Sequence, residues 1–171
     1  MSNEITIHEL DLIEPIMLEK LSELLINVVD DGASVGFLSP LTIEEATQYW
    51  KDVLQPGVTL WIVQSNGLVV GTVQLQLAMK PNASHRAEVA KLMVHPDYRR
   101  KGIANLLMKH LEHKALAKGI SLLVLDTRAE DPSNKLYKSM NYIEVGRIPR
   151  YSRSSTGELD DTVIYYKEIK P

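Results

Sequence analysis

The sequence contains no cysteine among its 171 residues. This absence excludes disulfides, thiolate metal sites and a cysteine nucleophile. The chain also has no uncharged apolar run of the roughly 20 residues that cross a membrane. Its first residues, MSNEITIHEL, lack the basic flank and apolar run of a secretory signal. We therefore expect a cytoplasmic protein with no membrane partner.

Positive charge is not in excess, because 19 Lys and Arg residues stand against 22 Asp and Glu residues, for a formal net charge of −3. This balance argues against a nucleic-acid partner bound by phosphate neutralisation. The patterns G-x-x-x-x-G-K-S/T and G-x-G-x-x-G after a strand are absent, which disfavours nucleoside triphosphatases and Rossmann dehydrogenases. No repeat or linker divides the chain, so residues 1–171 are predicted to form one domain.

The periodicity of apolar residues predicts the element order β-α-α-β-β-β-α-β-α-β-β. Thr42 and Glu45 form a capping-box pattern, and Asn66-Gly67 is a strong hairpin signal. We expect an α/β fold, with a mixed, mostly antiparallel sheet, helices on both faces and one parallel strand-helix-strand unit. Strands are expected at residues 4–9, 58–64, 68–79, 86–95, 121–126, 142–147 and 162–169, and helices from 15, after 42, at 102–118 and after 132. The helix at 102–118 is expected to bury Ile103, Leu106, Leu107 and Leu111.

The segment that opens this helix, Arg99-Arg100-Lys101-Gly102-Ile103-Ala104, is a candidate phosphate site. The first N–H groups of a helix have no intrahelical partner, and the helix dipole adds positive charge there. Gly102 and the small Ala104 would let a ligand approach the backbone closely. Spacing alone does not separate this interpretation from a glycine-containing turn with solvated cations.

RRKGIA matches the Q/R-x-x-G-x-G/A signature of the GNAT superfamily of acyl-CoA N-acetyltransferases, and LMVHPDYR resembles the strand and turn that precede it there. Together with the element order, the resemblance covers most of the chain. It implies a sheet of six to seven strands with a splayed parallel pair, and acetyl-CoA as cofactor. Pantetheine would bond to the backbone of Leu92 and Val94, and pyrophosphate to the amides of residues 99–105. The full set of implied cofactor contacts is Leu92, Met93, Val94, Arg99, Arg100, Lys101, Gly102, Ile103, Ala104, Asn105 and Asn134.

The segment around Tyr137, NKLYKSMNY, resembles the L-Y-x-x-x-G-F/Y segment of the GNAT family but departs from it at two positions. Asn141 stands where the family usually has glycine, and Glu130 stands where an asparagine is frequent, seven residues before Tyr137. Asn134 is the residue that could replace that contact. Several dispersed segments resemble one branch of the family, the tabtoxin-resistance acetyltransferases: GASVGF, KPN, RAEV-x-KLMV, LDT, VG-x-x-P-x-Y and TVIYYK.

Acetyl transfer to an amine needs a base for the amine and a proton for the departing thiolate. Glu88 and Asp126 are the candidate bases, carried over from the resemblance, with their division of labour open. Tyr137 is the candidate acid, because a phenol with a pKa near 10 can donate at neutral pH. The alternatives are a solvent-facing glutamate, a turn aspartate and a core tyrosine.

Two further expectations concern residue faces. Strict alternation puts Glu88 and Leu92 on one face of their strand and Lys91 on the other, unless a β-bulge between Glu88 and Leu92 resets the count. The histidines His110 and His113 are expected to face solvent without a third ligand, so we predict no metal site.

Asp31, Ser34 and Phe37, in the glycine-bearing segment DDGASVGFLSP, are predicted to bind the acceptor. The resemblance implies a small-molecule, amino-acid-like amine, with antibiotic or toxin detoxification as the role. A protein or peptide N-acetyltransferase and a non-catalytic acyl-CoA-binding module are the alternatives. The oligomeric state stays open, a homodimer being one option.

Overall fold

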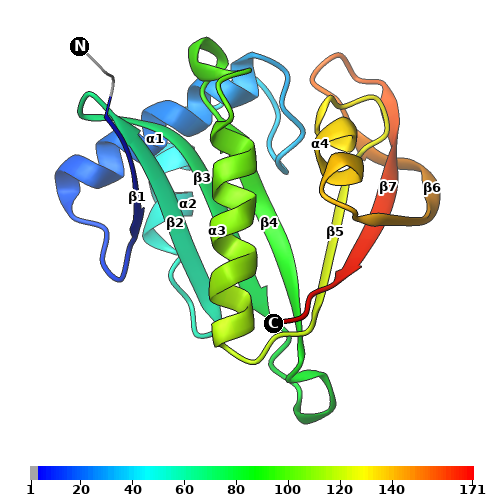
Figure 1. Ribbon diagram of the computed structural model, residues 1–171. Coiled ribbons are helices and arrows are strands. Elements are labelled where there is room, and N and C mark those ends of the chain that lie inside the picture. Colours follow the sequence, from blue (N-terminus) through cyan, green and yellow to red (C-terminus); the bar gives the residue numbers. More distant parts are fainter. Residues whose placement is uncertain (1–3) are drawn as a thin grey trace.

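The computed structural model describes residues 4–171 as a seven-stranded sheet with helices on both faces (Figure 1). The strands are β1 (Ile5–Glu9), β2 (Val58–Ser65), β3 (Leu68–Leu77), β4 (Arg86–Val94), β5 (Leu122–Arg128), β6 (Ile143–Arg153) and β7 (Leu159–Glu168). The helices are α1 (Pro15–Asp30), α2 (Ile43–Lys51), α3 (Ile103–Ala117) and α4 (Ser133–Ser139), with short 3-10 turns η1 (Pro81–Ala83) and η2 (Pro96–Tyr98). This order confirms the predicted sequence of elements.

The sheet order is β1-β2-β3-β4-β5-β7-β6. Every neighbouring pair is antiparallel except β4 and β5, which are parallel as predicted. Residues 86–88 of β4 pair with residues 122–124 of β5. Beyond them the two strands diverge, so that the sheet opens between them (Figure 1). The splayed pair expected from the family resemblance is therefore present.

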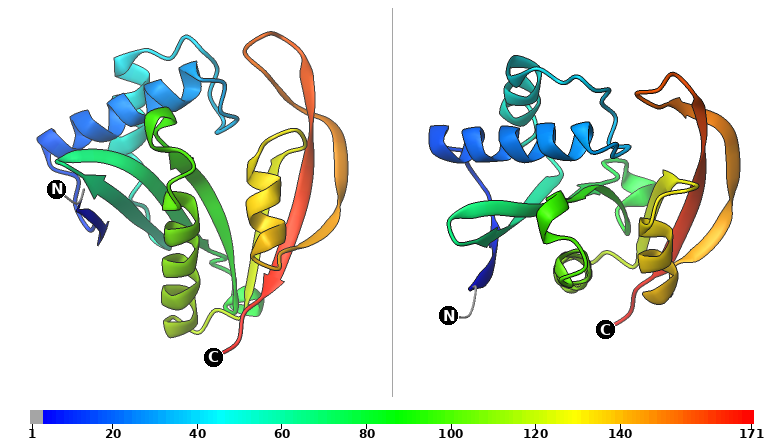
Figure 2. Two further views of the ribbon diagram at one scale, coloured as in Figure 1. Left: turned by 45° about the horizontal axis from the view of Figure 1, so that its top comes forward. Right: turned by 90° about the horizontal axis from the view of Figure 1, so that it is seen from above.

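Helices cover both faces of the sheet (Figure 2). One core contains α1 and α2 residues such as Leu25 and Trp50 against Ile62 and Met93 of the sheet. The other contains α3 and α4 residues against the opposite face. Of the described helices, none is long and apolar enough to cross a membrane.

The buried stripe of α3 differs from the prediction. Leu106 is 40% exposed, whereas Met108 and Ala115 are fully buried. The reason is rotational: residues 103, 107, 111 and 115 form a row at i+4 spacing, and Leu106 falls outside it. His110 is half-buried rather than solvent-facing, because its ring packs edge-on against Trp61 with centroids 5.8 Å apart.

Local turn chemistry explains most element ends. The Thr42–Glu45 capping box forms as predicted, and Asn66 and Gly67 both have positive φ, 51° and 77°, as the tight hairpin turn between β2 and β3 requires. The strand predicted at 142–147 instead continues to Arg153. Pro149 does not end it, because β6 is the edge strand and the proline lies at a register irregularity, where no ladder donor is needed.

Candidate active site

A β-bulge in β4 fixes which side chains share a face of the sheet. Thr72 pairs with Met93 and Gln74 with Ala90, so β4 carries one extra residue, and Lys91 has a positive φ of 53°. Lys91 contacts the α1–α2 side of the molecule, while Leu92 packs on the α3 side. The bulge expected between Glu88 and Leu92 is confirmed, and strict alternation, which separated Lys91 from Glu88, is wrong.

Glu88 and Asp126 line one open groove of about 200 Å³ where the sheet diverges. Glu88 is in register with Val124 of the parallel neighbour, so Asp126, two residues further along β5, lies on the same face. We call this the carboxylate groove, and its lining residues are Glu88, Val124, Leu125, Asp126, Ile148, Tyr151, Thr162 and Ile164. The structure therefore brings both predicted carboxylates together.

The two carboxylates have different surroundings. Partial burial, and next the negative charge of Asp126, raise the pKa of Glu88 above its ordinary value, while the positive charge of Lys91 opposes the shift. The Asp126 carboxylate is 2.9 Å from the Thr162 hydroxyl, which also lies 3.0 Å from the Thr127 carbonyl. Glu88 therefore holds a proton more readily than an exposed glutamate, and Asp126 is tethered to β7.

Tyr137 lies on α4, at the opposite face of the sheet, and is only 5% exposed. Its ring packs against Tyr142 and Tyr165, with centroids 5.7 and 5.8 Å away. Burial, and then the charges of Asp131 and Asp126, raise the pKa of its phenol well above 10. The phenol stays protonated at neutral pH, so it has a proton to donate, while its oxygen can still accept a hydrogen bond.

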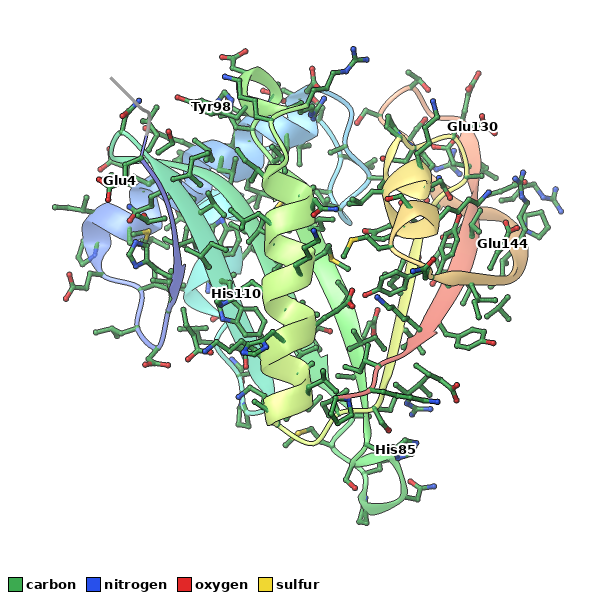
Figure 3. All side chains as sticks on the ribbon, in the orientation of Figure 1. Glu4, His85, Tyr98, His110, Glu130 and Glu144 are labelled. Carbon is green, nitrogen blue, oxygen red and sulfur yellow. The ribbon has the colours of Figure 1, made fainter. Side chains whose placement is uncertain are left out.

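The segment 99–105, which we call the phosphate cradle, has open backbone donors. Gly102 caps α3 in the left-handed region at φ 79°, and a Cβ placed on it would meet no protein atom within 4 Å. The first helical hydrogen bond runs from the Leu106 amide to the Gly102 carbonyl, so the amides of residues 103–105 have no intrahelical partner. Lys101 adds positive charge, with its ammonium 4.9 Å from the centroid of Tyr98, which lies at this end of α3 (Figure 3). This geometry fits an anionic ligand such as a pyrophosphate.

The divergent part of β4 offers a second set of backbone groups. Met93 and Val94 pair with β3, Leu92 lies in the bulge, and none of the three has a β5 partner, because the parallel pairing ends at Glu88. An extended ligand with amide groups could bond to such an edge as a strand would. The side chain of Met93 is buried in the α1–α2 core, so only its backbone faces this opening.

Asn134 is already engaged in protein hydrogen bonds. Its amide nitrogen donates to the carbonyls of Arg128, Ala129 and Asp131, and its oxygen accepts from the Tyr165 hydroxyl at 2.7 Å. It therefore braces the β5–α4 connection. Its predicted contact with the cofactor stays a prediction, limited to the remaining acceptor site of the oxygen.

The residues predicted to bind the acceptor lie on the connection between α1 and α2, the 31–42 loop. Asp31 forms an ion pair with Arg99 of the phosphate cradle, Ser34 is exposed, and Phe37 packs edge-on against Tyr49. The Ser39 amide donates to the Ser155 hydroxyl in the β6–β7 turn at 2.9 Å. The loop thus reaches across the divergence of the sheet to the far strands (Figure 2).

Sequence reasoning missed Lys91, which lies next to both carboxylates and the 31–42 loop. It also missed Thr162 and the chain of hydrogen bonds from Gln76 through Gln74 to the Tyr49 hydroxyl, beneath this side of the sheet. For Lys91 a signal was present. The bulge expected between Glu88 and Leu92 would turn an intervening side chain to the Glu88 face.

Comparisons with known proteins identify relatives of this chain. The model of the acetyltransferase (GNAT) family matches residues 31–142. An N-acetyltransferase from the hisH-hisA intergenic region of Azospirillum brasilense is 29% identical over 73% of this chain and 76% of its own length. An acetyltransferase of Yersinia pestis is 35% identical over 47% of this chain, and the match spans 55% of that relative.

Solved structures show the same fold. The N-acetyltransferase of Staphylococcus aureus Mu50 superposes with a TM-score of 0.82 at 21% identity, covering 98% of this chain and 99% of its own. The yncA protein of Salmonella typhimurium, solved with its cofactor acetyl-CoA, has a TM-score of 0.79 at 16% identity, covering 98% and 95%. The phosphate cradle and the free β4 edge fit that cofactor's pyrophosphate and its amide-bearing arm.

Proposed function

We propose, for a chain that belongs to the GNAT family of acetyltransferases and uses acetyl-CoA, that it acetylates the primary amine of a small, amino-acid-like molecule. The observation that carries the proposal is the carboxylate groove. It places Glu88 and Asp126 side by side where β4 and β5 diverge. We further propose a detoxifying role in the cytoplasm, following the resemblance of GASVGF and RAEV-x-KLMV to the tabtoxin-resistance branch.

The cofactor supplies an acetyl group activated as a thioester. The amide groups of the phosphate cradle, the cations of residues 99–101 and the backbone of Leu92 and Val94 hold it, with Asn134 as a further contact. The open space at the Gly102 Cα position supports this assignment, because any side chain would fill it. Asp31 pairs with one nitrogen of the Arg99 guanidinium, whose five N–H groups leave further donors for a phosphate.

Glu88 takes the proton from the amine. An alkyl amine has a pKa of about 10.4 and reaches the groove protonated, so it needs a base before it can attack. The raised pKa of Glu88 makes it a better proton acceptor than an exposed glutamate. Asp126, tethered by Thr162, supplies a fixed negative charge that attracts the ammonium form and sustains the Glu88 shift.

Tyr137 supplies the proton that the departing sulfur requires. Its phenol is protonated throughout the neutral range, because burial raises its pKa. The negative charge of Asp126 raises the pKa of Tyr137 as well as that of Glu88, so the proposed acid and the proposed base both respond to this carboxylate.

The shape of the site supports a compact acceptor. The 31–42 loop is bonded at Ser39 to Ser155, across the divergence of the sheet. A peptide acceptor would need an open channel beside this link. Ser34 and Phe37 would contact the acceptor from the loop.

A substrate screen tests the proposal. Purified protein is incubated with acetyl-CoA and with matched sets of amino acids, simple amines and short peptides, and free thiol release is measured. We expect turnover of small amines, strongly reduced by Glu88→Gln and abolished by Gly102→Glu. Peptides with a higher kcat/KM than every small amine would support the protein acetyltransferase alternative. Cofactor binding without turnover of any amine would support a non-catalytic module.

A further inference from the structure

Lys91 stands at the β4 bulge, three residues after Glu88, and its charge interacts with those of Asp126 and Glu88 in the carboxylate groove. Its ammonium donates to the Val35 carbonyl at 2.5 Å and lies 5.7 Å and 6.0 Å from the ring centroids of Phe37 and Tyr49. A side chain at Gly36 would meet this nitrogen at 2.9 Å. The 31–42 loop is thus built closely around the ammonium.

The ammonium makes no direct ion pair within the described part of the chain. Among residues 4–171, no carboxylate forms a salt bridge with Lys91, although Glu88 and Asp126 are close enough to influence its charge. The Lys91 side chain is half-buried, and this burial lowers its pKa. One carbonyl and two rings leave ammonium N–H groups without an acceptor. Partly buried charges are normally paired.

The backbone at Lys91 adds to this argument. A lysine at φ 53° is in the left-handed region, which costs free energy for any residue except glycine. The bulge that requires this conformation also turns the side chain to the face of Glu88. A lysine placed here at a conformational cost, and without a salt-bridge partner among residues 4–171, is expected to meet a directly contacting anion in a ligand.

The charges of the site are arranged for a molecule with two unlike ends. Glu88 and Asp126 attract an ammonium, whereas Lys91 attracts a carboxylate. Glu88 and Lys91 are three residues apart on one strand, which separates their backbones by up to roughly 10 Å. This span suits the amine and the acid group of one small molecule.

We propose that Lys91 binds the carboxylate of the acceptor and so makes amines that carry a carboxylate the substrate class of this enzyme. The inference rests on the proposed function, because it assigns the acceptor of the same groove. The loop contacts of Lys91 then have a second consequence: a carboxylate at the ammonium is enclosed by Phe37 and the backbone of Val35 and Gly36.

The test compares each amino acid with its own carboxamide. The probes are α-amino acids and an ω-amino acid series from glycine to 6-aminohexanoate, each beside the uncharged amide. For the wild type we expect a preference for the carboxylate of about 10- to 100-fold in kcat/KM, the value of a charged hydrogen bond in a partly buried site. Lys91→Met should abolish the preference by raising KM for the carboxylates alone.

Three controls keep the result interpretable. Lys91→Arg retains a cation and should retain the preference in part, and Lys114→Met, an exposed lysine on α3 at the opposite face, should change nothing. Acetyl-CoA affinity of Lys91→Met should equal that of the wild type. Full pH profiles are compared rather than single rates, because Lys91 lowers the pKa of Glu88, its removal raises that pKa, and Lys91 itself has a lowered pKa.

Two outcomes would overturn the inference. A wild type without preference between acid and amide would do so, as would equal losses for both series in Lys91→Met, since those indicate that Lys91 only positions the loop or acts in the chemical step. Failure of the proposed function looks different, because then no amine of either series releases thiol.

Discussion

Glu88 and Asp126 share a groove, yet their surroundings differ. Glu88 is partly desolvated and close to a like charge, which favours its protonated form. Asp126 has a hydroxyl partner on the neighbouring strand. These different surroundings are the physical basis of the roles we propose for the two carboxylates.

This difference predicts a shift in the pH profile. Glu88 must be ionised to accept a proton, so kcat/KM should rise with pH through its raised pKa. Asp126→Asn removes a negative charge that raises this pKa, so the acidic limb should move to lower pH. Glu88→Gln should abolish that limb and lower kcat on the order of 10²- to 10⁴-fold. Profiles measured with one amine for all variants test this, and an upward movement in Asp126→Asn would contradict it.

Substitution of Tyr137 tests its proposed role as the proton donor to the departing thiolate. Tyr137→Phe deletes one oxygen from a packed ring, so folding and acetyl-CoA affinity should change little, while kcat should fall by about 10²- to 10⁴-fold. Single-turnover rates and calorimetric titration of acetyl-CoA separate the two effects. An unchanged rate of the chemical step would exclude Tyr137 as the proton donor.

The helix α3 depends on a glycine in the strand beneath it. A Cβ at Gly71 of β3 would lie 2.9 Å from the Ile103 Cγ2 atom and 3.1 Å from the Leu107 Cδ1 atom. This close approach seats the first turn of α3, and with it the phosphate cradle, against the sheet. The missing side chain at Gly71 thus fixes the position of the proposed phosphate cradle.

Gly71→Ala should push this turn outward. We expect a loss of about 1–3 kcal/mol in the free energy of unfolding from overpacking, together with weaker acetyl-CoA binding. Gly146→Ala in β6 is the matched control, because a Cβ there meets no atom within 4 Å. Urea titrations and calorimetry provide the two measurements, and equal behaviour of the two variants would contradict the explanation.

The whole molecule is a sheet in two parts that meet at the base of β4 and β5. Only three residues of each strand pair across this junction, and the Ser39–Ser155 hydrogen bond joins the parts again at the loop. A ligand bound between the diverging strands would add contacts to both parts.

Acetyl-CoA should therefore stabilise the whole fold. At 100 times Kd the linkage amounts to about 2.7 kcal/mol, which for a chain of this length raises Tm by roughly 5–10 °C. Thermal unfolding is measured in EDTA with and without acetyl-CoA, and the full rise in Tm is expected without added metal. Gly102→Glu, which places bulk and negative charge in the cradle, should show none. A shift that requires added metal, or one that persists in Gly102→Glu, would contradict this prediction.

Signals carried by a few adjacent residues were sufficient to predict the element order. The capping box at Thr42, the Asn66-Gly67 turn and the glycine that opens α3 act within one turn of chain, so their outcome hardly depends on distant partners. The family signature in RRKGIA is local for the same reason. It indicated both the fold and the cofactor class, and the comparisons support both.

The tertiary structure decided what depends on strand register and on contacts between distant segments. The bulge that brings Lys91 beside Glu88 exists only because β3 and β4 pair with unequal residue numbers. Asp31 pairs with Arg99 across 68 residues of sequence, and the exposure of Leu106 follows from how α3 rests on Gly71. Residue types and periodicity specify each helix and strand. How two elements pack depends on the shapes of both, and this packing is what brings the charged side chains of the groove together.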